Sequence, residues 1–447
     1  MMKRSFKISV LLAAVLLIPL SGFGRLGITG DITPNIMLRV SDGSLINLPF
    51  RVGDLTLRYS VGDFDLTSNL ALETRWEDAE FDADMLQVRE AYLTWFPTFG
   101  EVKLGKIIHA WGAADANNPT DNLSPYDFYY MFLAGTDRKL GSLSGSIMTY
   151  FGDFQLEAVV IPQFVENRLP YNEPDFPIKI ELPADAELIN PEDEVEIGTR
   201  LKYAMGLGDI SVSYFKAHDR LPSPMGVKVQ QTMVGGALNP GIYPQLGYRE
   251  TNMIGADFVF FPGNWTLRGE GGYFATKTPD MDLDASLLTQ ESSYLQYILQ
   301  LEYSFANGVQ VTGQFIHTNY GDVEQTFTPD LNFATLPDTL QLDLLSRFSG
   351  ADFQAGMGTP FAMISEKVFI VSSMGTFFDN ALELSGMGMV NLEETGYMLN
   401  VGAEYTLRAG LNLVARSAYF IGGDEDGNRF REMEDFSNLT LGLNVSF

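Results

Sequence analysis

No cysteine occurs among the 447 residues of the chain, so no disulfide bond can brace its fold. Histidine is nearly absent as well, with only His109, His218 and His317. The sequence has no cluster of cysteine and histidine and no glycine-rich phosphate motif between a strand and a helix. We therefore expect neither a bound metal ion nor a cofactor.

The scarcity of histidine also argues against an enzyme. Acid–base or nucleophilic catalysis needs a positioned base beside a nucleophile or an activated water. His109 lies shortly before Asp115, and His218 directly precedes Asp219, but no serine-containing nucleophile motif accompanies either pair. A hydrogen-bonded histidine at a strand end is the simpler interpretation, and we expect no catalytic activity.

Basic residues are few, with 29 lysines and arginines against 57 aspartates and glutamates. The first 24 residues hold three of the basic residues and none of the acidic ones, so the remainder carries a net charge of −31. Nucleic-acid phosphates would repel such a surface, and we expect no nucleic-acid partner. The charge suits an outer surface among divalent cations, or a lumen that favours cations.

The chain also lacks any run of about 18 apolar residues, the length that a membrane-spanning helix needs. A shorter apolar stretch, residues 8–20, follows Lys3, Arg4 and Lys7 and precedes two small residues, glycines 22 and 24. This layout is typical of a secretory signal peptide over residues 1–24, and an uncleaved anchor is the alternative. We expect a cleaved leader and an exported mature chain, either soluble in the periplasm or inserted as a barrel.

After residue 60, apolar and polar residues alternate with a period of two. The clearest examples are residues 64–76, 295–305, 397–407 and 438–447. Strands of about ten residues with this pattern are typical of membrane barrels, which face lipid on one side and the lumen on the other. Aromatic residues gather at 92–96 and 258–261, as expected for interfacial girdles. A soluble sandwich also alternates, but its strands are usually shorter.

The connections between these strands are alternately short and long. Short turns are expected at 61–63, 97–100, 152–153, 206–208, 262–264, 306–308, 378–380 and 408–410. Long polar connections, with a brief one at 391–395, are expected at 40–50, 77–84, 111–139, 163–193, 219–247, 277–291, 320–360 and 422–435. Outer-membrane barrels have short periplasmic turns and long extracellular loops. We therefore predict an all-β fold, a transmembrane antiparallel β-barrel of about 18 strands over residues 25–447.

A barrel of this size leaves an aqueous channel, whereas eight strands would be filled by side chains. The charged residues in phase with the polar side are predicted to line the lumen wall: Glu73, Arg75, Arg200, Lys202, Arg268, Glu270, Glu302, Glu404 and Arg416. They either set up a transverse field across a pore or merely solvate the wall and pair across strands. Arg89 and Glu90 break the alternation, which predicts a bulge or a position outside the hydrocarbon.

The most distinctive stretch, residues 104–141, combines Gly-Lys-x-x-x-x-Trp-Gly with Asn-Pro-x-Asp and Asp-Arg-Lys. The motif residues are Gly105, Lys106, Trp111, Gly112, Asn118, Pro119, Asp121, Asp137, Arg138 and Lys139. In these residues the chain resembles a widespread group of poorly characterised proteobacterial outer-membrane barrels, relatives of porins and of alginate-type export channels. The resemblance implies a porin-like fold in the outer membrane of a Gram-negative bacterium. Formation of a homo-oligomer is expected only by analogy with porins.

The polar part of this stretch, residues 111–139, is predicted to fold inward and narrow the lumen. Turn formers such as Asn118-Pro119 and Ser124-Pro125 favour a compact loop. The residues expected at the constriction are Asp115, Asn117, Asn118, Asp121, Asp127, Asp137, Arg138 and Lys139. Charges in a narrow bore would select solutes by sign and size. The alternative is a structural latch at the barrel mouth, with Asp137 and Arg138 paired locally.

From these features we expect a porin-like channel for the diffusion of small solutes. The apolar run Phe128–Leu133 within the loop favours an alternative, an outer-membrane transporter of hydrophobic molecules. A surface adhesin or structural barrel is a second alternative, favoured if the lumen is blocked and the long loops dominate.

Two features concern partners. Between residues 166 and 196, ten acidic residues accompany Arg168 and Lys179. Oxygen ligands for calcium are abundant there, but no EF-hand-like spacing occurs, and a solvated external loop is the simpler interpretation. Phe447 ends the last strand and resembles the terminal aromatic signal read by the outer-membrane assembly machinery. The expected partners are thus that machinery, outer-membrane lipid and a small-molecule solute.

Overall fold

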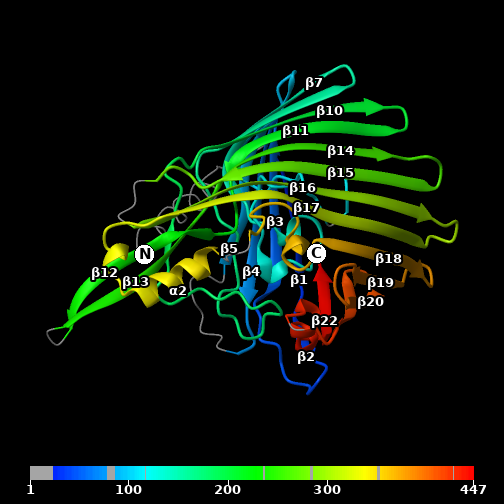
Figure 1. Cartoon of the computed structure of the whole chain (residues 1–447). Coiled ribbons are helices and arrows are strands. Elements are labelled where there is room, and N and C mark those ends of the chain that lie inside the picture. Colours follow the sequence, from blue (N-terminus) through cyan, green and yellow to red (C-terminus); the bar gives the residue numbers. More distant parts are fainter. Residues whose placement is uncertain are drawn as a thin grey trace.

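The computed structural model describes residues 24–77, 86–115, 117–234, 237–281, 285–349, 353–425 and 427–447 (Figure 1). The predicted signal peptide lies outside the described residues except for its last residue, Gly24. Most of the connection predicted at 77–84 also lies outside them. Among the described residues, no helix is long and apolar enough to cross a membrane.

The wall is a closed antiparallel β-barrel of eighteen strands. β1 (Arg25–Ile32) and β2 (Asn35–Arg39) are separated at Pro34, which has no N–H to donate, and they form the first wall strand together. The next wall strands are β3 (Phe50–Val61), β4 (Phe64–Thr74), β5 (Leu86–Trp95), β6 (Gly100–Ile107), β7 (Ser142–Phe151), β8 (Phe154–Ile161), β10 (Glu196–Met205), β11 (Gly208–His218) and β14 (Glu250–Phe260). They are followed by β15 (Trp265–Lys277), β16 (Ser286–Ser304), β17 (Gln310–Thr328), β18 (Lys367–Phe377), β19 (Leu382–Asn391), β20 (Gly396–Arg408), β21 (Leu411–Gly422) and β22 (Asn438–Ser446).

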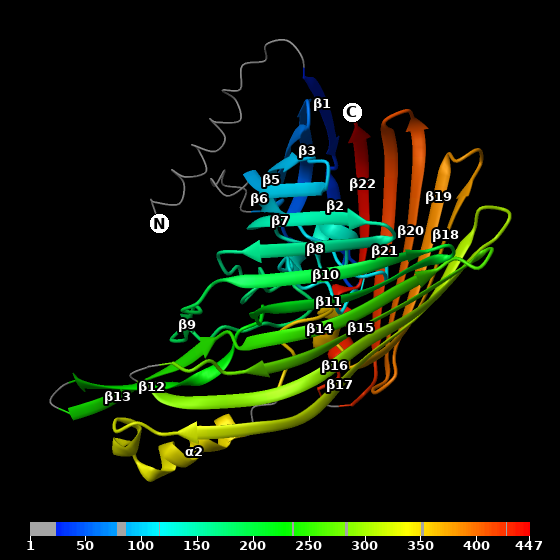
Figure 2. The same cartoon turned by 90° about the horizontal axis from the view of Figure 1, so that it is seen from above.

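The last strand closes the barrel against the first (Figure 2). Asp31 and Ile32 of β1 pair with Ser446 and Val445 of β22, and β2 continues the pairing further along β22. Closure leaves no sheet edge, so the backbone N–H and C=O groups of the wall are satisfied without water. The predicted fold class and strand number are confirmed.

The connections alternate in length as the sequence predicted. All eight expected short turns are found, and they join β3 to β4, β5 to β6, β7 to β8, β10 to β11, β14 to β15, β16 to β17, β18 to β19 and β20 to β21. The long connections therefore gather at the opposite end of the barrel. This arrangement puts the loop between β6 and β7, residues 108–141, at the end that carries the long loops.

Several long connections contain regular structure where the sequence suggested only polar loops. β12 (Ser223–Val234) and β13 (Ala237–Gly247) form a hairpin, and β9 (Glu187–Ile189) pairs in parallel with β13. α2 (Asp338–Ser349) joins this hairpin in a small apolar core, and both project beyond the wall (Figures 1 and 2). The short helices are η2 (Phe128–Tyr130), η3 (Gly135–Arg138), η4 (Phe333–Thr335), η5 (Pro360–Met363), α3 (Arg429–Glu432) and η6 (Glu434–Phe436).

The outer face of the wall is apolar, and aromatic rings gather beside the short turns. On β16, Leu295, Leu299 and Leu301 are exposed on this face, whereas Gln296 and Gln300 are buried on the inner face. Rings near the short turns contact one another: Phe64 with Trp95, Phe151 with Phe154, Phe154 with Tyr203, and Trp265 with Tyr303. A lipid-facing band with an aromatic girdle explains this distribution.

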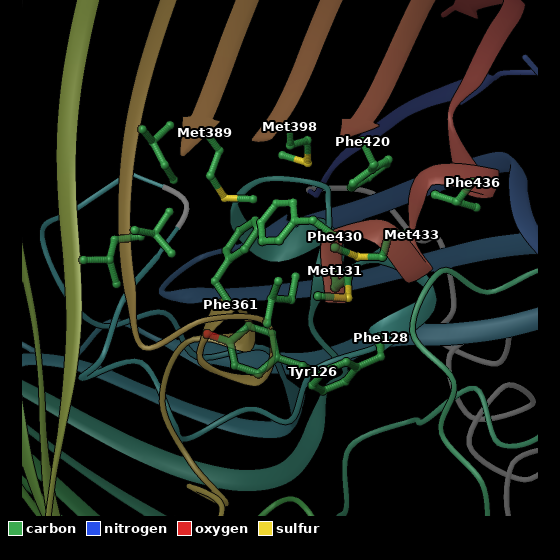
Figure 3. Close-up of a cluster of buried hydrophobic side chains, with 14 of the residues drawn as sticks. Tyr126, Phe128, Met131, Phe361, Met389, Met398, Phe420, Phe430, Met433 and Phe436 are labelled. Carbon is green, nitrogen blue, oxygen red and sulfur yellow. The ribbon is translucent and has the colours of Figure 1, made fainter. Parts of the chain in front are cut away.

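The largest hydrophobic core lies inside the barrel (Figure 3). Met389, Met398 and Phe420 project inward from β19, β20 and β21. They pack with residues of five connections, including Met131, Phe361, Phe430, Met433 and Phe436. Loops that bury apolar side chains against inward-facing residues of the wall are held inside the barrel by the hydrophobic effect.

Candidate functional site

The loop between β6 and β7 crosses the interior and contacts several parts of the wall. The Trp111 indole N–H donates to the Glu157 carboxylate of β8 (3.0 Å). The backbone N–H of Asp115 donates to the Gln300 side chain of β16 (2.9 Å), and the Asn117 amide donates to the Gln314 side chain of β17 (3.1 Å). The loop is therefore attached along the inner face of the barrel.

Glu270, on the inner face of β15, holds the middle of the loop. Its Oε2 accepts from the backbone N–H of Ala113 (2.9 Å), the backbone N–H of Ala114 (3.2 Å) and the Asn118 amide (3.0 Å). Its Oε1 accepts from the backbone N–H (2.9 Å) and hydroxyl (2.7 Å) of Thr120. Burial of a carboxylate is costly unless such donors surround it.

Gly112 makes this arrangement possible. Its φ of +95° lies in a region that side chains rarely adopt, and an added Cβ would lie 2.5 Å from Oε2 of Glu270. Glycine in the motif is therefore required by both backbone conformation and space.

Two glycines of the wall make room for the loop. A Cβ on Gly255 of β14 would lie 2.6 Å from Cγ2 of Thr120, and a Cβ on Gly272 of β15 would lie 3.3 Å from the Pro119 carbonyl oxygen. Both residues face the interior, in phase with Glu270. A side chain at Gly255 would push the loop away from the wall.

Asp115, in the first half of the loop, carries a carboxylate that reaches water. Its side chain is 60% exposed, and it accepts hydrogen bonds from Arg268 (2.7 Å) and Gln300 (2.7 Å). The Gln314 amide donates to its backbone oxygen (3.0 Å). Its position is thus fixed from β15, β16 and β17 while one side of the carboxylate remains open.

Other residues predicted for the constriction are buried between loop and wall. Asn117 and Asn118 are buried, and Asp121 accepts from the backbone N–H of Trp111 (3.2 Å). Lys139 lies 3.3 Å from the Asp121 carboxylate and donates to the Asp121 carbonyl oxygen (2.6 Å). These side chains hold the loop in shape and do not line open water, because their partners cover them.

Asp127 is fully buried beside two arginines from other segments. It accepts from Arg168 (3.2 Å) and lies 3.6 Å from Arg51 of β3. Arg168 also binds Glu73 of β4 through two hydrogen bonds (2.9 and 2.7 Å). Burial raises the pKa of Asp127, and the nearby arginines partly offset that effect. Asp127 therefore faces a charge network and not the lumen water.

Asp137 and Arg138 do not pair as the latch alternative predicted. The Asp137 carboxylate is 63% exposed and lies 3.5 Å from Arg89, whereas the Arg138 guanidinium lies over the Tyr126 ring at 5.3 Å. The register of β4 and β5 skips Arg89, since Asn69 pairs with Glu90 and Leu70 with Val88. The predicted bulge therefore exists, and it lets Arg89 and Glu90 both reach the loop.

Two other long connections also fold inward. Thr359, between β17 and β18, donates its hydroxyl to Asn117 (2.8 Å), and the backbone N–H of Gly358 donates to Asn122 (2.7 Å). The segment after β8 pairs with the loop through the backbone of Arg168, which bonds Tyr126 and Phe128. At this level the loop of residues 108–141 is thus bound both to the connection between β8 and β10 and to the connection between β17 and β18.

The residues predicted for the lumen wall lie on the inner face of the barrel, except Arg75, which directly follows the end of β4. Most of them have charged or polar partners. Glu270 binds the loop, and Arg416 is exposed on the inner face of β21. The remaining contacts are Glu73–Arg168 (2.7 Å), Arg75–Glu173 (2.6 Å), Arg200–Asp257 (2.8 Å), Lys202–Asp209 (2.8 Å), Arg268–Glu302 (3.2 Å) and Glu404–Asn412 (2.7 Å). Four of these contacts join strands of the wall, whereas Glu73 and Arg75 contact residues of the connection between β8 and β10. A role in selecting solutes stays a prediction.

Most acidic residues of the segment 166–196 are exposed, as expected of a solvated loop, but three of them pair with basic residues. Its Glu173 pairs with Arg75, Asp175 with Arg39 (2.8 Å), and Glu196 with Arg220 (2.6 Å). Within the part of the chain that the structure describes, no group of three or more potential ligand side chains is arranged to hold a metal ion.

Phe447 lies at the closure seam. Its backbone N–H and C=O both pair with Gly30 (3.0 Å each), and its side chain is exposed. Its role as an assembly signal stays a prediction.

Sequence reasoning missed the acceptors and donors that receive the loop, chiefly Glu157, Gln300 and Gln314. Their only signal is a polar residue in the inward phase of a strand, which many wall positions share. Nothing local in the sequence connects them with a loop that is distant along the chain.

No protein-family model matches the sequence, and comparison with curated proteins gives no match either. Solved structures do match. OccK2 (OpdF) of Pseudomonas aeruginosa, in complex with glucuronate, aligns with a TM-score of 0.51 and 10% identity over 94% of this chain and 97% of that one. The outer-membrane protein OpdK of the same organism aligns with a TM-score of 0.49 and 10% identity over 95% and 98%. A BenF-like porin of Pseudomonas fluorescens Pf-5 gives 0.47 and 11% over 94% and 98%.

At such low identity the likeness concerns the fold alone. The chain has the fold of a porin-like outer-membrane β-barrel.

Proposed function

We propose that the chain is an outer-membrane channel through which small solutes diffuse, and that the loop of residues 108–141 narrows its lumen. The attachment of this loop to the inner wall through Glu270 carries the proposal. A wide barrel has room for water, and an inserted loop reduces the bore to a size at which solutes are discriminated. The exposed carboxylate of Asp115 is the charge best placed to act on a passing solute.

Location in the outer membrane is supported by the closed wall with its apolar outer face. An export leader over residues 1–24 and a terminal aromatic at Phe447 belong to the same proposal. We also propose the finer resemblance, to relatives of alginate-type export channels. The contacts made by its motif residues support it. Trp111, Gly112 and Asn118 all help to hold the loop within the barrel.

The test is ion conductance of the purified protein in planar lipid bilayers, together with swelling of liposomes in neutral sugars of increasing size. We expect stepwise currents, and swelling with small sugars that stops above a size limit. A heat-denatured sample, whose barrel is unfolded, is the control. A folded barrel that gives neither current nor swelling would refute the channel.

A second candidate, the transport of hydrophobic molecules, is favoured by the apolar core inside the barrel (Figure 3). Met131, Met389 and Met398 contribute flexible, polarisable side chains, which adapt to ligands of irregular shape. In this case protein-containing liposomes should take up a hydrophobic fluorescent dye faster than empty ones while ion current stays near zero. Met398→Asn should then slow dye uptake, whereas under the channel proposal it should leave sugar swelling nearly unchanged.

A further inference from the structure

Two glycines interrupt the apolar outer face of the wall beside the closure seam. One row of cross-strand partners runs over β1, β3, β4 and β5 and consists of Ile32, Gly53, Leu72 and Leu86. The three side chains of this row are exposed on the outer face. Because Gly53 has no side chain, the row is hollow at β3.

The neighbouring row contains the second glycine, but there the hollow is filled. The backbone of Phe447 pairs with Gly30 of β1 through two hydrogen bonds (3.0 Å each), and a Cβ added to Gly30 would lie 2.7 Å from Cζ of the Phe447 ring. A Cβ added to Gly53 would have the Asp31 carbonyl oxygen as its nearest neighbour, 3.7 Å away. The protein therefore covers Gly30 with its own terminal ring and leaves the space over Gly53 open.

The open space is a groove of about 220 Å³ on the outer face. Its apolar lining side chains are Ile32, Leu55, Leu70, Leu72, Leu86 and Phe447. Asp31 and Asp54 also border the groove, but their carboxylates are bound on the inner side, by the Ser446 hydroxyl (2.7 Å) and the Asn69 amide (2.7 Å). The groove therefore offers a ligand apolar atoms and almost no hydrogen-bonding group.

Aromatic pairs place the groove within the hydrocarbon of the bilayer. On the side of the short turns lie the rings of Phe64 and Trp95, with centroids 6.4 Å apart, and on the side of the long loops lie those of Phe50 and Trp76, 5.4 Å apart. Aromatic rings gather at the two interfaces of a membrane barrel. Leu72 lies between the two pairs along the chain and nearer to Trp76, so the groove belongs to the half of the bilayer on the side of the long loops.

The dimensions of the groove suit one hydrocarbon chain. The row from Ile32 to Leu86 crosses three strand spacings, about 14 Å. One acyl chain fills half of a hydrocarbon core of about 30 Å, which is about 15 Å. A second barrel would present a convex wall, which cannot enter a groove in another convex wall. An unbranched chain can enter it, and van der Waals packing stabilises such contacts inside a bilayer.

We propose that this groove is a binding site for one acyl chain of a bilayer lipid, which is held more firmly there than on the rest of the wall. The bound chain would also cover the closure seam, because Ile32 pairs with Val445 of β22 and Phe447 pairs with Gly30. The site requires only that the barrel lies in a bilayer, and it does not depend on whether the lumen conducts.

The experiment is photolabelling of the purified protein in liposomes that contain a small fraction of phosphatidylethanolamine with a diazirine in the middle of one acyl chain. After irradiation and proteolysis, mass spectrometry locates the labelled residues. We expect labelling of residues 53–55, 70–72 and 86 to exceed several-fold that of residues 295–301 of β16, where no outward position is a glycine. A chain held in a groove exchanges more slowly than its neighbours and is labelled preferentially.

Gly53→Leu should remove this preference, because its side chain would occupy the groove and its Cβ fits there without a clash. Gly388→Leu, the matched control, adds the same side chain on the outer face of β19, where nothing lies within 4 Å of the added Cβ. It should be labelled like the parent protein. Heat-modified mobility on gels establishes that each variant is folded. If Gly53→Leu does not fold, Leu86→Trp takes its place, because it narrows the groove from β5.

Equal labelling of the groove and of β16 in the parent protein would overturn the site, and so would strong labelling that persists in the folded variant with a filled groove. Weak labelling of the groove together with a stable oligomer on unheated gels would overturn it in favour of contact between copies. Because labelling does not use ion flow, a barrel that carries no current can still confirm the site. A conducting barrel without preferential labelling would refute the site alone.

Discussion

Glu270 accepts both the backbone N–H and the hydroxyl of Thr120 through a single carboxylate oxygen, at 2.9 and 2.7 Å. The two residues are 150 positions apart in the chain, one on the wall and the other in the loop. Their contact fixes the loop to the inner face of β15. The bore of the lumen at this level therefore depends in part on this buried carboxylate, beside the contacts of the loop with Glu157, Gln300 and Gln314.

Replacing the carboxylate should loosen the loop. In Glu270→Gln, an NH₂ group replaces one of the two acceptor oxygens. It would then face N–H or O–H donors of the loop, with which it cannot form hydrogen bonds as an acceptor. We expect a loss of about 2–4 kcal/mol in the free energy that holds the loop, since hydrogen bonds to charged groups contribute about 1.5–3 kcal/mol each. The measurement is the rate of limited proteolysis within residues 108–141. Glu404→Gln, whose partner is Asn412, is the control and should be cleaved at the parental rate.

A side chain at Gly255 should displace the loop by steric exclusion. Gly255→Val places atoms where Thr120 Cγ2 now lies, and either the loop or the wall must move. We expect larger single-channel currents from a folded barrel. Gly388→Val on β19 has nothing within 4 Å of its added Cβ and should leave the current unchanged. Equal currents in all three proteins would argue that the loop does not limit flow.

The exposed carboxylate of Asp115 should contribute to cation preference, because a fixed charge in a narrow bore concentrates counter-ions. Asp115→Asn should shift the reversal potential in a salt gradient towards that of an unselective pore. Asp127→Asn is the buried counterpart and should shift it less. The difference should fade near 1 M salt, where the screening length is roughly 3 Å. A larger shift from Asp127 than from Asp115 would contradict the geometry.

His109 should make barrel stability depend on pH. Burial lowers the pKa of His109 from 6.5 to about 4, and Lys103 adds to this effect. The unfolded chain therefore binds a proton between pH 6.5 and 4 that the folded chain does not. The contribution of His109 to stability is complete above pH 6.5 and falls by about 3 kcal/mol as the pH drops to 4. Urea unfolding in detergent should show this fall in the parent protein, and a smaller one in His109→Gln.

The wall could be predicted from sequence because each of its elements carries a local signal. The alternation around Leu295, Gln296 and Leu299 indicates directly which side of β16 faces lipid. The short turns indicate where the chain reverses direction between neighbouring strands. Even the irregularity at Arg89 and Glu90 was visible, since two adjacent charges cannot both point inward without a bulge.

The interior could be predicted only in part. Residues 111–139 were expected to enter the lumen, but which of their charges would meet water depended on partners that are distant in sequence. Asp127 is buried because Arg168 and Arg51 pack against it. Asp115 is exposed to solvent because its partners contact it from one side only. The hairpin of β12 and β13 was missed because its strands belong to an extension beyond the lipid-facing wall.

The apolar core inside the barrel was missed for a related reason. Met389, Met398 and Phe420 occupy inward positions that the barrel pattern assigns to polar residues. Their role in packing against the inward-folded loops cannot be recognised from the strand sequence, because those loops are distant along the chain.

The most direct test of the central claim is the single-channel conductance of a variant that lacks residues Asn117 to Leu133, compared with the parent protein in the same lipid and salt. If the loop narrows a water-filled lumen, the deletion should raise the conductance several-fold and allow larger sugars to pass in the swelling assay. Heat-modified mobility must first establish that the shortened barrel is folded. A folded variant with the same conductance and the same size limit as the parent protein would contradict the account.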